Sequence, residues 1–306
     1  MIDTSTLATI GIALLGGAIR VSTPYLFVSL GECITEKSGR INLGQEGVLV
    51  LGAMVGYAGS YETGNAWLGL LYAGIAGAGL GALHALACSL RRVNDIAIGI
   101  AVLLFGTGLA FLLGKPYIQP AAPMLSAVEL GWWSDNEAIR SALRVNALFF
   151  VGVVLAFVLR WGFASLRWGL ILRTVGDSAD AARALGFSIL WVRFLATVVG
   201  AFLSGVGGAF LSLYYPGSWT ESLSGGQGLM AVALVIFARW EPLRCLWASL
   251  LFGAAGALGP ALQSAGYSQV YYLVAAAPYA LTLAILVASS SRERRAAGAP
   301  RELRVV

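Results

Sequence analysis

Apolar stretches long enough to cross a membrane follow one another along most of this chain. A helix needs roughly 20 apolar residues to span the hydrocarbon core of a bilayer. Only 11% of the 306 residues are charged and 58% are hydrophobic, whereas a soluble domain carries about 25% charged residues. We therefore predict an all-α polytopic membrane protein. The apolar segments lie near residues 7–31, 41–60, 66–90, 94–114, 146–166, 192–214, 226–239, 244–263 and 267–289.

These segments give about nine spans, and eight to ten are compatible with the sequence. Arg20 and Pro24 lie inside the first segment, and we expect them to break it. The seventh segment, 226–239, is short, which favours a partial or re-entrant helix. No basic region precedes the first segment, so a cleavable signal peptide is not expected.

The distribution of Lys and Arg predicts the orientation, because cytoplasmic loops are enriched in both. With nine spans, most basic residues fall on one side, which we assign to the cytoplasm together with the basic tail 291–306. The opposite side then holds the N-terminus and the loop 115–145. Trp132 and Trp133 in that loop favour an interfacial helix with an aromatic anchor. The basic residues gather at 37–40, 91–92, 160–183, 239–244 and 292–304.

The stretch ESLSGGQGLM, residues 221–230, contains the letters of the signature loop of ABC-transporter ATPases. In those ATPases a helix N-terminus after the loop points N–H groups at a phosphate. Here the letters fall in an outer loop, and no GxxxxGK[ST] sequence exists in the chain. We interpret Gly225, Gly226 and Gly228 as a turn ahead of a span.

The segment 165–195 between the fifth and sixth spans predicts a short helix on the cytoplasmic side. Asp177 or Ser178 can cap its N-terminus, and Gly186 is a natural stop. The helix would present an apolar knob to a cytoplasmic partner, or it would only join two spans. The knob consists of Ala182, Leu185 and Phe187.

Three motifs resemble permeases of ABC importers. The run 180–186 looks like their EAA-xxx-G coupling motif, with Asp180 in place of Glu. Residues 226–253 resemble the late segment of ribose/nucleoside-type permeases, and residues 31–57 are very similar to their N-terminal signature. The matching signature residues are Glu32, Glu36, Lys37, Ser38, Gly39, Asn42, Leu43, Gly44, Glu46 and Gly47. The chain thus resembles permeases for nucleosides, simple sugars and branched-chain amino acids, and is closest to the shorter permease of nucleoside importers.

The resemblance implies a type II-like importer fold in a bacterial cytoplasmic (inner) membrane. Residues 1–290 would form a single transmembrane domain with a coupling segment at 167–191. Expected partners are a double-domain ATPase, a second permease chain and an external solute-binding lipoprotein. The chain would be no enzyme itself and would need neither cofactor nor metal. The residues expected to contact the ATPase are Asp180, Ala181, Ala182, Arg183, Leu185 and Gly186.

Polar side chains at membrane depth are costly and are candidates for function. Each also has a structural alternative, since Asn42 and Glu46 could join the second span to a neighbour. His84, the single histidine, is either a helix–helix contact or a proton relay. We expect Cys33, Cys88 and Cys245 to be small packing residues. The candidates for the substrate pathway are Asn42, Gln45, Glu46, Asn94 and Asp95.

The first functional hypothesis is therefore the permease of an ATP-driven nucleoside importer working by alternating access. Sugar or riboflavin-like cargo is the nearest alternative. A stand-alone secondary transporter or channel is a second hypothesis, but the carboxylates lie at span ends rather than at mid-membrane. An intramembrane hydrolase would need His84 as its base, and no GxSG or metal-binding pair accompanies it.

Overall fold

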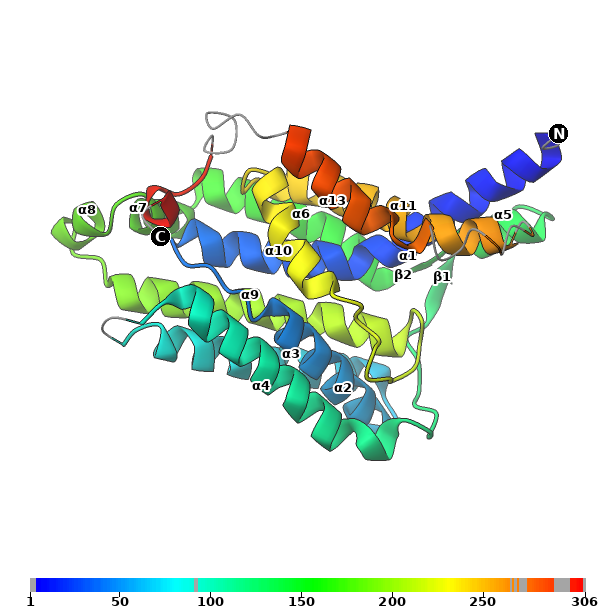
Figure 1. The fold of residues 1–306 in the computed structure, drawn as a ribbon, viewed down its shortest axis with the longest axis horizontal. Coiled ribbons are helices and arrows are strands. Elements are labelled where there is room, and N and C mark those ends of the chain that lie inside the picture. The colour runs from blue at the N-terminus through cyan, green and yellow to red at the C-terminus, as the bar shows by residue number, and fades with distance from the viewer. Residues whose placement is uncertain are drawn as a thin grey trace.

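The computed structural model describes residues 4–90, 93–264, 266, 269, 274–288 and 298–304. Its main helices form a bundle elongated along the helix axes (Figure 1). The predicted segment 267–289 and the predicted tail 291–306 lie partly outside the described residues, and Arg91 and Arg92 lie wholly outside them. The bundle helices are α1 (Thr4–Lys37), α2 (Gln45–Thr63), α3 (Ala66–Ala87), α4 (Asp95–Gly114), α6 (Ala147–Ser165), α9 (Ile189–Leu213), α10 (Gln227–Phe237), α11 (Pro242–Ser264) and α13 (Ala277–Ala288).

Shorter elements mark the two ends of the bundle (Figure 1). One end, called the α8 end below, carries α7 (Arg167–Asp177), α8 (Ala179–Ala184) and the 3-10 helix η3 (Arg301–Arg304). The opposite end, called the α5 end, carries the N-terminus and the remaining short elements. These are η1 (Lys115–Tyr117), β1 (Ala127–Glu129), α5 (Glu137–Ala142) and β2 (Arg144–Asn146).

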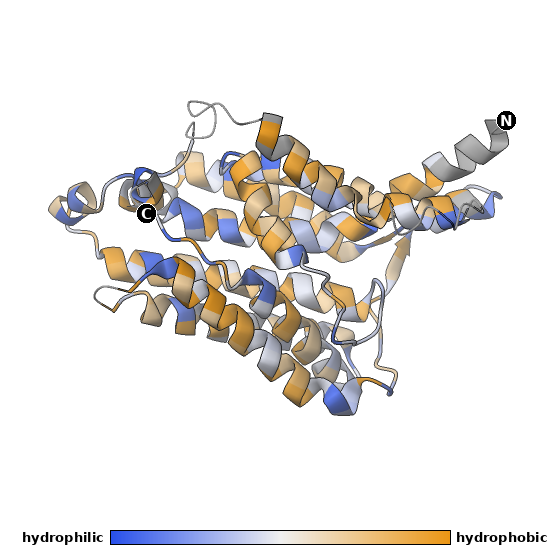
Figure 2. Cartoon of the chain, viewed as in Figure 1, coloured by the Kyte–Doolittle hydropathy of each residue, from blue (hydrophilic) through white to orange (hydrophobic). Residues whose placement is uncertain are grey.

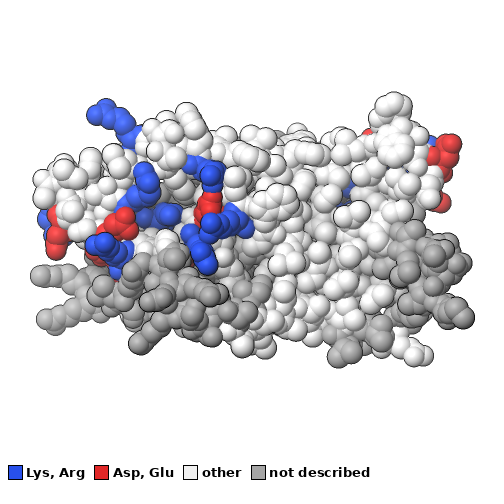
Figure 3. All heavy atoms as spheres, turned by 90° about the horizontal axis from the view of Figure 1, so that it is seen from above, with Lys and Arg blue, Asp and Glu red and all other residues white. Residues whose placement is uncertain are grey.

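The described helices are those of a multi-pass membrane protein. Their residues are largely apolar (Figure 2), many large apolar side chains are exposed, and the charged side chains gather toward the two ends of the face in Figure 3. Six described helices are long and apolar enough to cross a membrane. They cover Gly11–Lys37, Ala66–Ala87, Asp95–Tyr117, Ala147–Ser165, Ile189–Leu213 and Pro242–Ser264.

The predicted count of about nine spans is thus only partly supported. A helix occupies each of the predicted apolar segments, but α2, α10 and α13 do not meet the same criteria. α2 carries Gln45, Glu46 and Glu62, which lower its hydropathy. α10 has 11 residues and is about 16 Å long, about half the thickness of the hydrocarbon core. Its length agrees with the predicted partial helix.

The predicted break in the first segment is wrong. α1 runs without interruption through Arg20 and Pro24. Proline removes one helix hydrogen bond, but α1 lies between α9 and α11, and membrane helices tolerate proline where neighbours pack around it. Arg20 reaches out of the helix and donates a hydrogen bond to the carbonyl oxygen of Ser141.

The 115–145 loop contains a short helix, as predicted, but the two tryptophans lie outside it. Trp132 and Trp133 lie in an exposed turn, and the helix of this loop, α5, follows them. β1 and β2 pair antiparallel, with Ala127 opposite Asn146. This small sheet departs from a purely α-helical fold and joins the middle of the 115–145 loop to its end.

Helix α9 lies at the centre of the bundle and approaches its neighbours through glycine. A Cβ atom added to Gly208 would lie 2.1 Å from the carbonyl oxygen of Leu49 in α2. A Cβ atom on Gly200 would lie 2.4 Å from the carbonyl oxygen of Gly31 in α1, and one on Gly77 of α3 would lie 2.4 Å from that of Ala201. Small residues let membrane helices approach backbone to backbone, so α1, α2, α3 and α9 form one tightly packed block.

Candidate functional site: a helix junction and a charged network

Two helices begin inside the bundle rather than at its ends. α2 starts beside the middle of α4, where a Cβ atom on Gly106 would lie 2.8 Å from the carbonyl oxygen of Gly47. α10 starts beside α2, since a Cβ atom on Gly228 would lie 2.6 Å from the Cα atom of Glu46. The N-termini of α2 and α10 therefore meet at mid-depth in the bundle (Figure 1).

Glu46 joins these two N-termini. Its Oε1 atom accepts hydrogen bonds from the Ser224 hydroxyl at 2.6 Å and the Gly226 N–H at 3.1 Å, and its Oε2 atom accepts from the Gly228 N–H at 2.7 Å. The carboxylate lies in the first turn of α2 and also bonds the first free N–H groups of α10, where negative charge is stabilising.

The contacts of Glu46 show what the 221–230 stretch does in the fold: it forms the turn and the N-terminus of α10. Gly225 and Gly226 have positive φ angles, so they form the turn expected from the sequence. The N–H groups of Gly226 and Gly228, which a nucleotide phosphate would need, are already bonded to the Glu46 carboxylate. The contacts of Glu46 thus fit the structural role considered for it, in which it joins the second predicted span to a neighbouring helix.

A second carboxylate, Glu32 of α1, holds the chain just before α2. Its Oε1 atom accepts from the Asn42 N–H at 2.7 Å, and its other oxygen accepts from the Gln45 amide. The Asn42 side chain in turn accepts from the Gly44 N–H at 2.9 Å. We call this set the helix junction, and it consists of Glu32, Asn42, Gln45, Glu46, Ser224, Gly226 and Gly228.

Amide groups at the two helix starts keep unused hydrogen-bonding capacity. Asn42 and Gln45 are fully buried. Among the described residues, the Nδ2 atom of Asn42 and the Oε1 atoms of Gln45 and Gln227 are buried without a partner. A buried polar atom without a partner costs about 1–3 kcal/mol, so these three atoms are suited to binding a polar molecule.

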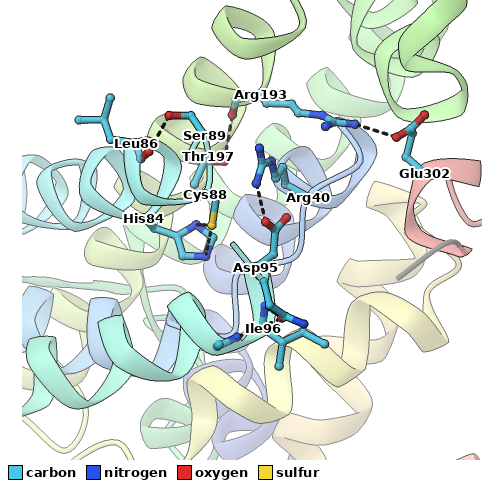
Figure 4. A network of polar contacts seen from close by, with 12 residues as sticks. Arg40, His84, Leu86, Cys88, Ser89, Asp95, Ile96, Arg193, Thr197 and Glu302 are labelled. Carbon is cyan, nitrogen blue, oxygen red and sulfur yellow. Dashed lines mark hydrogen bonds and ion pairs between the residues drawn. The ribbon is translucent and has the colours of Figure 1, made fainter. Parts of the chain in front are cut away.

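A charged network occupies the α8 end (Figure 4). Arg40, in the loop between α1 and α2, pairs with Asp95 at 2.5 Å. Arg193 of α9 donates to the carbonyl oxygen of Ser38 at 3.1 Å and pairs with Glu302 of η3 at 3.2 Å. We call Ser38, Arg40, Asp95, Arg193 and Glu302 the charged network.

The five predicted pathway residues therefore divide into two groups. Asn42, Gln45 and Glu46 belong to the helix junction, whereas Asp95 belongs to the charged network. Asn94, beside Asp95, is exposed and caps α4 by accepting from the Ile96 and Ala97 N–H groups at 2.8 and 3.2 Å.

Helix α8 has the limits that the sequence predicts. Ser178 caps its N-terminus by accepting from the Ala181 N–H at 3.2 Å. Gly186 follows with φ +83°, and the Phe187 N–H bonds the Ala182 carbonyl oxygen at 3.0 Å. Together with the bond from the Gly186 N–H to Arg183, this is a Schellman motif, which fixes the end of the helix.

The predicted apolar knob needs a correction. Ala182 is fully buried, so it cannot be presented to a partner. Leu185 is 65% exposed and is the apolar side chain that α8 offers outward. Asp180 and Arg183 pair at 2.8 Å across the exposed face, where water screens both charges.

His84 is fully buried in α3, and its Nε2 atom lies 3.6 Å from the Cys88 sulfur one turn along the same helix (Figure 4). His84 also contacts the backbone of Asp95 at the start of α4, so its surroundings fit the predicted helix–helix contact. All three cysteines are free and buried, as expected of packing residues. The contacts of Glu36 were not anticipated: its carboxylate accepts from the Trp240 indole N–H and ties α1 to the turn after α10.

Sequence comparison identifies the kind of protein that carries these features. A family model described as "Branched-chain amino acid transport system / permease component" matches residues 10–289, nearly the whole chain. The chain belongs to this permease family. It is the permease component of an ABC transporter and not itself an enzyme.

Several relatives of this permease have described functions. It is 34% identical to the putative glucose ABC transporter permease protein TsgC13 of Haloferax volcanii, covering 80% of this chain and 76% of the relative. It is 30% identical to the nucleoside ABC transporter permease protein NupC of Lactococcus lactis, covering 76% and 77%. It is 28% identical to the guanosine ABC transporter permease protein NupQ of Bacillus subtilis, covering 87% and 88%.

Proposed function

We propose that this permease moves a nucleoside, or a related uncharged and hydroxyl-rich solute, into the cell at the expense of ATP hydrolysed by a separate chain. Two of the relatives above act on nucleosides, which supports this cargo. The glucose-type relative makes a sugar the alternative, and a riboflavin-like solute has the same need for polar contacts.

The proposed assembly contains a double-domain ATPase, a second permease chain and an external solute-binding lipoprotein, in a bacterial inner membrane. The permease would have a type II-like fold with about nine spans, in which α2 and α10 enter the bilayer without crossing it like ordinary spans. We assign the α8 end to the cytoplasm, because most basic residues of the described chain lie there. These include Lys37, Arg40, Arg160, Arg167, Arg173, Arg183, Arg193, Arg239 and Arg244.

The proposal that α8 contacts the ATPase rests on the capping and the exposure of this helix. A short helix with a fixed cap and a fixed stop projects from the bundle with Leu185 exposed, between α7 and α9. α8 contacts both α7 and α9, so a force applied to it from outside would reach α9. We assign the contact with the ATPase to Asp180, Ala181, Arg183, Leu185 and Gly186, and a supporting role to Ala182.

We place the cargo contacts at the helix junction and at Gln227, which lies between two of its residues in the chain. The partnerless atoms of Asn42, Gln45 and Gln227 offer one donor and two acceptors, which suit hydroxyl and base groups of an uncharged solute. Glu46 and Glu32 would hold the helix starts, Asp95 would act in the charged network, and Asn94 would cap α4 rather than contact cargo. Movement of α2 against α10 would open the junction to one side of the membrane at a time.

Transport measurements test this proposal. The permease with its partner ATPase, second permease chain and binding protein is reconstituted into liposomes, and uptake of labelled guanosine and glucose is measured with and without ATP. We expect ATP-dependent uptake of one of the two. Uptake by the permease alone, driven by an ion gradient and indifferent to ATP, would instead establish a secondary transporter.

A variant of α8 tests the coupling contact. Leu185→Glu places a charge on an exposed side chain and leaves the buried face intact, so we expect normal membrane insertion but loss of most ATPase co-purification. Leu190→Glu, at an equally exposed position (59%) at the start of α9, is the matched control. Equal co-purification from both variants would refute the α8 contact.

A further inference from the structure

The C-terminal residues fold back onto the proposed coupling helix. Residues 298–304 lie at the α8 end, where η3 packs against α7 and Leu303 packs on the apolar core around α1, α10 and α11. A Cβ atom on Gly298 would lie 3.0 Å from the carbonyl oxygen of Arg239. The segment is thus seated in the bundle rather than lying free beside it.

Glu302 in this segment connects α8 with α9. Its Oε1 atom accepts from the N–H of Ala179, the first residue of α8, at 3.0 Å. Its Oε2 atom pairs with Arg193 of α9 at 3.2 Å (Figure 4). The side chains of Arg193 and Glu302 are only 16% and 33% exposed, so solvent screens the pair much less than a surface ion pair.

Arg193 connects Glu302 to residues 38–46, which run from the α8 end into the bundle. Arg193 also donates to the Ser38 carbonyl oxygen, at the start of the stretch that continues through Arg40 to the helix junction. Gly39 lies against this contact, since a Cβ atom there would be 3.0 Å from both Arg193 and Glu302. The Glu302 carboxylate therefore lies where α8, α9 and residues 38–46 meet.

We propose that Glu302 is a positioning residue that holds α8 in register with α9 and with residues 38–46. The C-terminal segment thereby becomes part of the coupling device. This inference rests on the proposed role of α8 in ATPase contact. A carboxylate is required, because it can satisfy a helix N–H and a guanidinium at the same time.

The test compares Glu302→Gln and Glu302→Asp with Arg301→Gln, a change at an exposed neighbour in the same segment. The first measurement is amide hydrogen exchange of residues 179–186 in the purified permease, without the ATPase. We expect Glu302→Gln to speed exchange about tenfold, with Glu302→Asp intermediate and Arg301→Gln unchanged. Unchanged exchange in Glu302→Gln would overturn the proposal, whatever the ATPase does.

The second measurement is cargo moved per ATP hydrolysed in the full reconstituted complex. We expect Glu302→Gln to keep ATPase co-purification but to lower this ratio roughly fivefold, with partial recovery in Glu302→Asp. An unchanged ratio with normal co-purification would refute the role of Glu302 in coupling. Failure of the unaltered permease to bind the ATPase would instead refute the proposed function, and hydrogen exchange would still decide whether Glu302 positions α8.

Discussion

The contacts of Glu46 predict the effect of removing its charge. In Glu46→Gln the remaining oxygen can still accept from Ser224 and Gly226, but the new NH2 group faces the Gly228 N–H, which loses its acceptor. A buried donor without an acceptor costs about 1–3 kcal/mol, and the lost attraction between charge and helix N-terminus adds about 0.3–1 kcal/mol. We expect a loss of about 2–3 kcal/mol in the free energy of unfolding.

Thermal unfolding in detergent, followed by size-exclusion chromatography, measures this loss. The expected fall in Tm is roughly 5–10 °C. Glu62→Gln is the matched control, because Glu62 is exposed at the far end of α2 and accepts a hydrogen bond from the Tyr117 hydroxyl. If Glu46→Gln and the control unfolded at the same temperature, the Glu46 carboxylate would not anchor α10, and the argument from its hydrogen bonds would be refuted.

Two further pairs of substitutions separate tight packing from backbone conformation. Gly208→Ala brings a methyl group against the Leu49 carbonyl oxygen and should destabilise the fold by about 1–3 kcal/mol, whereas Gly79→Ala in α3 meets nothing within 4 Å and should leave Tm unchanged. Gly186→Val has room for its side chain but must adopt φ +83°, so we expect about 1–2 kcal/mol of local strain, a frayed end of α8 and weaker ATPase co-purification, with Gly186→Asn milder. Identical behaviour of the valine and asparagine variants would contradict the argument from backbone conformation.

Hydropathy predicted where the helices lie, because burial in lipid demands long apolar runs whatever their partners. It could not predict how deep each helix begins. α2 and α10 start at mid-depth because Glu32 and Glu46 bond the chain there, and these bonds join residues far apart in the sequence. The predicted helix break at Arg20 and Pro24 was wrong for a similar reason. Arg20 donates a hydrogen bond to Ser141 and neighbouring helices pack around Pro24, and both partners are distant in the sequence.

The limits of α8 were predictable because capping is local: Ser178 and Gly186 act within a few residues of the helix they bound. Which face of α8 is exposed depends on its packing against the bundle, so Ala182 was misplaced. The contact of Glu302 with α8 could not be predicted from the sequence. It joins a polar tail to a helix more than a hundred residues away, and no local pattern indicates such a contact. Glu32 did have a signal in the sequence, because Glu32 and Glu36 stand one turn apart directly after the first predicted apolar segment, 7–31.

The reciprocal contact between Gly31 and Gly200 has an evolutionary consequence. A methyl group on either residue would strike the other's carbonyl oxygen, at 2.2 Å or 2.4 Å, so neither can change first and a double change is worse than a single one. Substitution of either glycine would require α1 and α9 to move apart. The close contact of Gly208 in α9 with α2 opposes that movement. Descendants of this sequence should therefore inherit these glycines unchanged while their lipid-facing residues diverge freely.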